Sequence, residues 1–210
     1  FFITLILAAC NTPDASPATP AKVVEQPAVT STATLTPPVP ATAAPAVVVF
    51  NDPVLEALLR ASMGKRDGGI TAPEAQAVTR LDLNMELPRR LSEDALITDI
   101  SGLEKFTNLE NLDLSHQAIT DISALQGLTK LTTLSLSGNP IGDITPLAQL
   151  TSLKGLALSN CVAQDYSPLA NLVNLEILFL DHASITDVSP LASLANLQQL
   201  YLANSPVSDY

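Results

Sequence analysis

The stretch LENLDLSHQAITDISALQGLTK, residues 109–130, carries a 22-residue pattern that the chain repeats to its end. Leucines stand at its first, fourth and sixth places, and a polar run and an Ile-x-Asp-Ile turn follow them. The pattern begins again at intervals of 22 residues, at Leu131, Leu153, Leu175 and Leu197. Such a strict period indicates a stack of equal structural units.

The leucine spacing within one unit predicts a short strand. Leu112 and Leu114 are two residues apart and point to one side of it, while Asn111, Asp113 and Ser115 point to the other. One unit cannot cover its own leucines, so successive strands, about 4.8 Å apart, form a parallel sheet over a continuous core. The pattern therefore predicts an α/β leucine-rich repeat solenoid, with the sheet on its concave face and short 3-10 or α turns on its convex face.

Other places of the repeat predict how each turn is held. At the ninth place, where leucine-rich repeats usually have an inward Asn, this chain has Gln117, Asn139, Cys161, Ala183 and Ser205, so the likeness to that repeat class implies that Cys161 is a core thiol. The thirteenth place is always aspartate: Asp99, Asp121, Asp143, Asp165, Asp187 and Asp209. Calcium takes about six to eight oxygens, so we expect each Asp to cap its own turn instead. Hydroxyl–proline pairs such as Thr145–Pro146 predict an N-cap and the start of a short helical turn.

Residues 49–77 are predicted to form a helical cap over the first repeat. The segment DPVLEALLRASM, residues 52–63, has an apolar helical stripe, and its initial Asp and Pro favour a helix start. Thr71 and Glu74 match a capping box, so we expect a second helix there. The repeats are assigned to residues 78–210, and the extra residues between Asn84 and Ile97 are expected to form a loop.

The cap segment, the stretch ITDISGLEKFTNLENLDLS at residues 97–115 and the 22-residue units together resemble the internalin family of bacterial surface proteins. The resemblance covers roughly residues 50–210. It implies a curved solenoid whose inner sheet binds protein partners. Because contact residues vary between members of the family, the resemblance does not identify the partner.

The first 48 residues differ from the rest in composition. Residues 10–48 hold eight of the 16 prolines and few charges, which predicts a disordered linker. Residues 1–9 are too few to span a bilayer but fit the apolar core of a signal peptide. The stretch Leu7–Cys10 resembles the bacterial lipoprotein box, which implies a lipid anchor on Cys10. We expect the signal peptide and the repeat array to be truncated in this sequence, and the last repeat to fray.

Composition and motif content narrow the possible functions. The 210-residue chain has a formal net charge of −11 and a pI of about 4.3, which disfavours binding to nucleic acid. His116 and His182 lie three repeats apart, about 14 Å at one strand spacing per repeat, so they cannot share a metal ion. With no phosphate-binding glycine loop, CxxC motif or nucleophile–base pair, we predict no cofactor, no metal site and no catalysis.

The third, fifth and seventh places of each repeat should form the exposed face of the sheet. They are small and polar in the repeats that begin at Leu109, Leu131 and Leu153. The next two repeats bring apolar and aromatic side chains to this face, which more often mark a binding site than an accident. We therefore predict a partner-binding site made of Ile177, Phe179 and Tyr201, with a polar rim of Asp181, Gln199 and His182.

These features lead to one functional hypothesis and two alternatives. We predict a non-catalytic, monomeric module that is lipid-anchored at a bacterial surface, touches the membrane only through its anchor, and binds a protein or glycan on the concave face. Alternatively, the chain is the targeting domain of a larger envelope enzyme. A third hypothesis is an intracellular regulatory scaffold, which requires that the apolar stretch before Cys10 is not an export signal.

Overall fold

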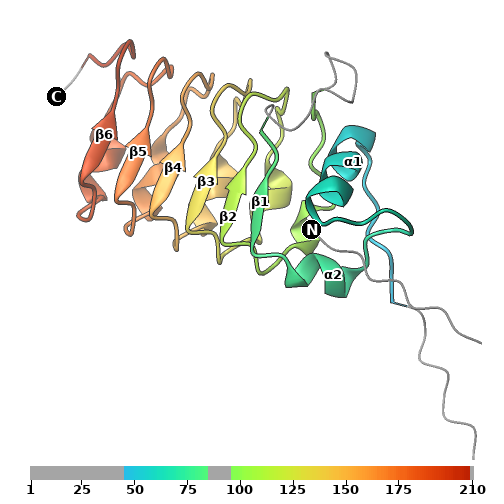
Figure 1. Cartoon of the computed structure of the whole chain (residues 1–210). Helices are drawn as coiled ribbons and strands as arrows, with labels where there is room; N and C mark the ends of the chain where they lie inside the picture. Colours follow the sequence, from blue (N-terminus) through green and yellow to red (C-terminus); the bar gives the residue numbers. More distant parts are fainter. Residues whose placement is uncertain (1–44, 85–95, 209–210) are drawn as a thin grey trace, which may run out of the picture. The chain divides into compact units, whose positions relative to one another are not determined.

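The computed structural model describes residues 45–84 and 96–208, and these form a row of repeats preceded by two helices (Figure 1). The helices are α1 (Pro53–Ser62) and α2 (Ala72–Ala77). The described strands are β1 (Arg80–Asp82), β2 (Asn111–Asp113), β3 (Thr133–Ser135), β4 (Gly155–Ala157), β5 (Ile177–Phe179) and β6 (Gln199–Tyr201). They form one parallel sheet in chain order, which confirms the predicted solenoid.

Stacked leucines build the core beneath the sheet. The register pairs Leu112 with Leu134, Leu134 with Leu156, and Leu156 with Leu178, so the leucine at the middle of each strand faces its equivalent in the next repeat. Each of these four side chains is at most 2% exposed. The equivalent Leu200 is 40% exposed, because β6 has a neighbouring strand on one side only.

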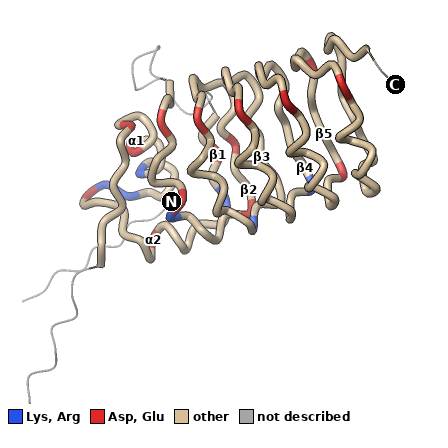
Figure 2. The backbone as a smooth tube through the Cα atoms, turned by 180° about the vertical axis from the view of Figure 1, so that it is seen from behind, with Lys and Arg blue, Asp and Glu red and all other residues tan. Residues whose placement is uncertain are grey.

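Short 3-10 turns lie behind the sheet in the five repeats that carry β1 to β5. They are η1 (Leu103–Lys105), η2 (Ser123–Leu125), η3 (Thr145–Gln149), η4 (Ser167–Asn171) and η5 (Ser189–Ser193). Figure 2 shows acidic positions that recur from one turn to the next along this side.

The aspartate at the thirteenth place holds each described turn, as predicted. Its Oδ1 accepts the backbone N–H two residues later, at 2.7 to 2.8 Å, in Asp99, Asp121, Asp143, Asp165 and Asp187. The predicted hydroxyl N-caps were wrong. Thr145 makes no cap bond and instead donates its N–H to Asp143, because the Asx turn already supplies the acceptor.

The two helices cover the open side of the first repeat. Leu55 and Leu59 of α1 are fully buried against the core, and the predicted capping box at the start of α2 is present. Glu74 accepts the Thr71 N–H at 2.7 Å and pairs with Lys65 at 2.6 Å. These bonds hold the pKa of Glu74 at about 2, well below its ordinary value.

Asp52 joins the cap to the repeats. Its Oδ1 accepts the N–H groups of Val54 and Leu55 at the start of α1, as an N-cap should. Its Oδ2 accepts the N–H groups of Thr98 and Asp99, 46 and 47 residues later, and the Thr98 hydroxyl. The side chain therefore fixes where α1 sits on the first turn.

The folded unit begins before the predicted cap. Ala46, Val47 and Val48, which we assigned to the linker on composition, pair with the cap: Val48 donates its N–H to Ile70, and Ala46 accepts from Ala72. The predicted signal peptide, the lipidation residue Cys10, the rest of the linker, most of the loop after Asn84, and Asp209 lie outside the described residues. Among the described residues, no helix is long and apolar enough to cross a membrane.

Candidate binding face

The side chains at the third, fifth and seventh places of the repeats line one surface, which we call the strand face. Over β2, β3 and β4 this surface carries small and polar groups. The hydroxyls of Ser115 and Ser135 are hydrogen-bonded at 2.6 Å, and Ser115 also donates to Asp113. This half of the strand face has few groups that project far toward a partner.

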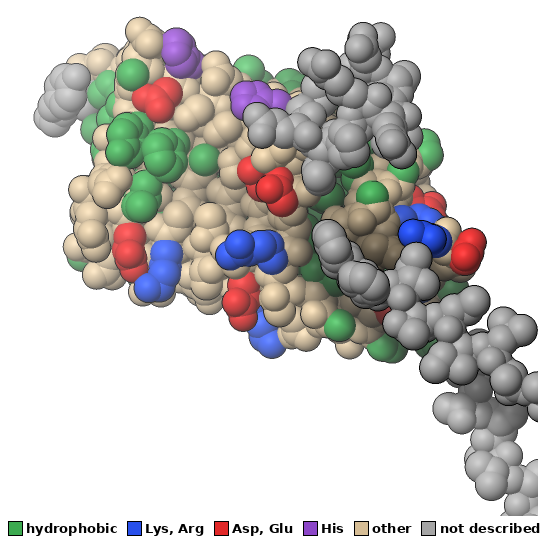
Figure 3. Space-filling view, in the orientation of Figure 1, with side chains coloured by type: hydrophobic (Ala, Val, Ile, Leu, Met, Phe, Trp, Pro, Cys, Tyr) green, Lys and Arg blue, Asp and Glu red, His purple; other side chains and the backbone are tan. Residues whose placement is uncertain are grey.

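Two aromatic rings project from the other half. Phe179 of β5 and Tyr201 of β6 are paired in the register, and their rings stack with centroids 4.5 Å apart and planes 9° apart. They are 36% and 42% exposed; the neighbouring core leucine Leu178 on β5 is fully buried, whereas Leu200 on β6 is 40% exposed. Figure 3 shows hydrophobic side chains gathered over β5 and β6, on a face that is otherwise mainly polar.

The structure brings all six predicted site residues into two adjacent repeats. Ile177 is partly buried beside Gln199, its register partner. Gln199 accepts the Tyr201 hydroxyl at 3.1 Å, and Oδ1 of Asp181 accepts the Ala203 N–H at 2.8 Å. Five of the six residues belong to the strand face. The sixth, His182, lies on the turn that follows.

The eighth place of the repeat is a feature that the sequence analysis missed. His116, Gly138, Asn160, His182 and Asn204 all have φ between 55° and 72°, the left-handed region. Glycine and asparagine adopt this region readily, and histidine is also enriched there. The recurrence of these residue types every 22 residues was the available signal. The left-handed backbone conformation therefore accounts for histidine at these two positions.

Neither histidine belongs to a catalytic arrangement among the described residues. His182 lies 3.3 Å from the Asn204 amide, and no hydrogen bond joins either histidine ring to a described serine or carboxylate. Within residues 45–84 and 96–208 no group of three or more His, Cys, Asp or Glu could hold a metal ion.

The ninth place supports the strand face from inside. Asn139 is 1% exposed, accepts the Ile119 N–H at 3.1 Å, and donates to the carbonyls of Leu114 and Leu136 at 2.8 and 2.9 Å. Cys161 occupies the same place and is a core thiol, as predicted. Burial raises its pKa to about 12, so it stays protonated and unreactive.

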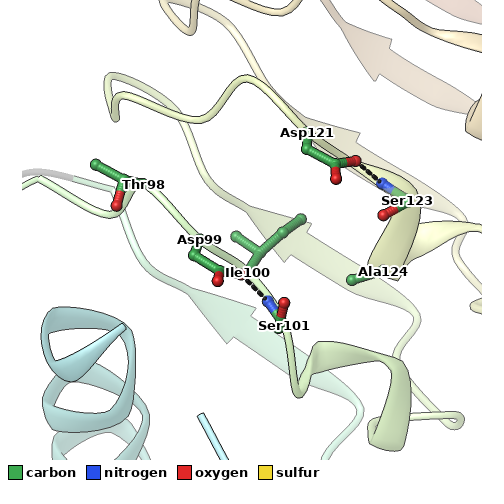
Figure 4. Close-up of a pocket in the computed structure, with 7 residues that line it drawn as sticks. All are labelled: Thr98, Asp99, Ile100, Ser101, Asp121, Ser123 and Ala124. Atoms are coloured by element: carbon green, nitrogen blue, oxygen red, sulfur yellow. Dashed lines mark hydrogen bonds between the residues drawn. The ribbon is translucent and has the colours of Figure 1, made fainter. Parts of the chain in front are cut away.

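An acidic hollow lies at the turns of the first two repeats. It is lined by Asp99 and Asp121 with their neighbours, and Figure 4 shows that each carboxylate is bonded within its own turn, to Ser101 and Ser123. Hydrogen bonds from the Ser101 hydroxyl and N–H hold the pKa of Asp99 below its ordinary value. These acids are therefore part of the turns rather than a separate site.

Known proteins share this architecture. The family described as leucine-rich repeats (2 copies) matches residues 107–149 and, in an overlapping match, residues 129–171. An internalin from Listeria monocytogenes has a similar structure, with a TM-score of 0.71, 34% identity and 79% of this chain covered. This chain covers 48% of that internalin, which is less than half its length.

A second solved structure extends the likeness to another organism. A leucine-rich repeat protein of Leptospira interrogans has a TM-score of 0.57 at 25% identity, with 68% of this chain and 35% of that one covered. No sequence among the curated proteins matches this chain significantly. The chain thus folds as a leucine-rich repeat solenoid and is similar to an internalin in sequence and fold.

Proposed function

We propose that this chain is a non-catalytic module that binds a protein partner on its strand face, centred on Phe179 and Tyr201. The observation that carries the proposal is the exposed, stacked pair of rings. Leucine-rich repeats of the internalin type commonly bind proteins, and the fold is of that type. The rest of the strand face is small and polar, so a partner can approach the rings without obstruction.

The energetics also favour a docking role for the two rings. Each large aromatic side chain contributes strongly to association when a partner buries it, and aromatic residues dominate the centres of protein interfaces. The core does not need the Phe179 ring, because Leu178 and Leu180 on either side of it in the sequence are already fully buried. Polar groups at Gln199, Asp181 and His182 surround the pair, as in the rim of an interface.

The first site prediction concerns these two rings. We expect the double substitution of Phe179 and Tyr201 by alanine to reduce partner capture at least about tenfold, because it removes two candidate hot spots. The measurement uses a photo-crosslinking amino acid placed at Ala203 in the full chain, expressed in its own cell type and exposed to the cells or surfaces it meets. Crosslinked proteins are identified by mass spectrometry.

Two matched controls make this measurement specific. The same crosslinker at Gln149, exposed on η3, should capture different proteins or none. Alanine at the exposed Thr133 on β3 should leave capture from position 203 unchanged. A partner that is captured equally well by the double alanine variant would remove the ring pair from the binding site.

We also propose that the module is held at a bacterial surface by a lipid on Cys10, as a monomer. The apolar segment before Cys10 and the likeness to internalins support this location. Metabolic labelling with an alkyne-tagged palmitate in the native cell is expected to mark the protein, and Cys10→Ala is expected to abolish the label. Labelling of the Cys10→Ala variant, or none in the unchanged protein, would contradict the anchor.

A further inference from the structure

We propose that the strand face binds an arginine side chain of its partner, in a slot beside Phe179. This inference rests on the proposed function, because it names the chemistry of the partner at the same face. The slot is the space over Ala157, the register partner of Phe179 on β4. Gly155 and Ser159 border it along the strand face.

The stacking geometry creates the slot. The centroids of Phe179 and Tyr201 are 4.5 Å apart with nearly parallel planes, close to the spacing of about 4.8 Å between neighbouring strands. The rings therefore stack along the direction from strand to strand. One face of Phe179 is covered by Tyr201, and the opposite face turns toward β4. There the register places only the methyl group of Ala157.

A planar group fits this position. It would continue the stack by one strand spacing, with the small residues Gly155 and Ala157 beneath it. Three kinds of planar or flat group are common on protein ligands: an aromatic ring, the face of a sugar, and a guanidinium. Stacking geometry alone does not choose between them, because all three bind to aromatic faces.

The negative charge of Asp181 favours the guanidinium among these three groups. Asp181 follows β5 on the same face as Phe179 and two residues further along, which places the side chains about 7 Å apart. Its Oδ1 accepts the Ala203 N–H, while its Oδ2 has no hydrogen-bond partner among the described residues. A guanidinium stacked on Phe179 can donate to that oxygen and also neutralise its charge, whereas an aromatic ring offers no donor and a sugar hydroxyl donates without carrying the opposite charge.

No Lys or Arg of residues 45–84 and 96–208 forms an ion pair with this carboxylate. Beyond residue 106 the chain contains two basic residues, Lys130 and Lys154, against nine acidic ones. Lys130 donates to Asn108 at 2.6 Å, and Lys154 pairs with Glu176 at 2.9 Å, so both have other partners. The excess of acid also attracts a cationic partner over a longer range.

The test uses small probes and the full chain. Isotope-labelled protein is titrated with N-acetyl-arginine amide, with the lysine and citrulline equivalents, with N-acetyl-phenylalanine amide, and with methyl glucoside, and binding is followed by NMR shifts at Phe179, Ala157 and Asp181. We expect the arginine probe to bind at least about threefold more tightly than each other probe, since stacking and a charge-assisted hydrogen bond act together. Its affinity should fall with added salt.

Substitutions then locate the site. Ala157→Leu fills the slot and is expected to abolish arginine binding, while Thr133→Leu, the matched change two strands away from β5, should leave it unchanged. Asp181→Asn keeps an oxygen for the Ala203 N–H and should remove the preference for arginine over citrulline. Unchanged amide shifts elsewhere in the chain show that each variant is folded.

The outcomes separate this inference from the proposed function. Tighter binding of the phenylalanine or glucoside probe, or arginine binding that survives Ala157→Leu, overturns the arginine slot. If either result is found and Ala157→Leu still blocks crosslinking of the partner from position 203, the strand face remains the docking site. Arginine binding at the slot without any partner captured from position 203 supports the slot and contradicts the proposed docking function.

Discussion

Replacing Asp52 with alanine is expected to lower the free energy of unfolding by about 3 kcal/mol, because it breaks a buried network of charge-assisted hydrogen bonds. Asp52 is 5% exposed and accepts four backbone N–H groups and one hydroxyl. Its loss removes the N-cap of α1 and leaves the N–H groups of Thr98 and Asp99 without this acceptor. Urea unfolding followed by circular dichroism measures the change.

The effect of Asp52 should depend on pH in a defined direction. Burial raises the pKa of this carboxyl, but bonds from the N–H groups of Thr98, Leu55, Asp99 and Val54 together outweigh it and hold the pKa below its ordinary value. A lowered pKa means that the stabilisation is complete above the unfolded value and is lost as the pH falls through the folded one. The stability difference between the unchanged protein and Asp52→Ala should therefore be constant from pH 7 to 5 and narrow below about pH 4.

Two further variants test this prediction more specifically. Asp52→Asn keeps one acceptor oxygen but turns an NH₂ toward N–H groups, so it should be nearly as unstable as the alanine variant at pH 7. Its stability difference from the unchanged protein should also narrow below about pH 4, because the narrowing comes from protonation of Asp52 in the unchanged protein. Asp121→Ala removes one exposed turn bond and should cost no more than about 1 kcal/mol. Equal losses for Asp52→Ala and Asp121→Ala would show that Asp52 does no more than cap a turn.

Replacing Asn139 with alanine should be comparably damaging, at about 3 kcal/mol. The amide makes three hydrogen bonds to buried backbone groups of two successive turns, each worth about 1 kcal/mol, and a small void adds to the cost. Thermal unfolding of the full chain would show the loss as a lower midpoint.

The same position offers an internal comparison. Cys161 donates weakly to Leu136 from the ninth place, and Ala183 has no hydrogen-bonding side chain there, so single repeats tolerate its absence at a cost in stability. Gln149→Ala, on the exposed side of η3, should stay within about 0.5 kcal/mol of the unchanged protein. An Asn139→Ala variant as stable as Gln149→Ala would mean that solvent or rearranged backbone replaces the three bonds.

Much of the candidate site could be predicted from the period alone. With a strict 22-residue spacing, Phe179 and Tyr201 occupy the same place in successive repeats, so their contact follows from counting. The ring orientation did not follow from counting, because rotamers depend on the packing of neighbouring side chains. The parallel stack, and hence the uncovered face of Phe179, is a property of the folded sheet.

The sequence by itself determined the core and the turn aspartates, which recur in each repeat. The leucine core and the aspartate turns repeat because each unit makes the same local and nearest-neighbour bonds, so the same residue type recurs every 22 residues. Contacts that occur in only one place in the chain were determined by the tertiary structure. Asp52 reads as an ordinary helix cap, and only folding brings its second oxygen to Thr98 and Asp99. The composition around Val48 likewise predicts a linker, but in the folded structure Val48 donates its N–H to Ile70. Such contacts join non-repeating segments far apart in the chain, so no period in the sequence reveals them.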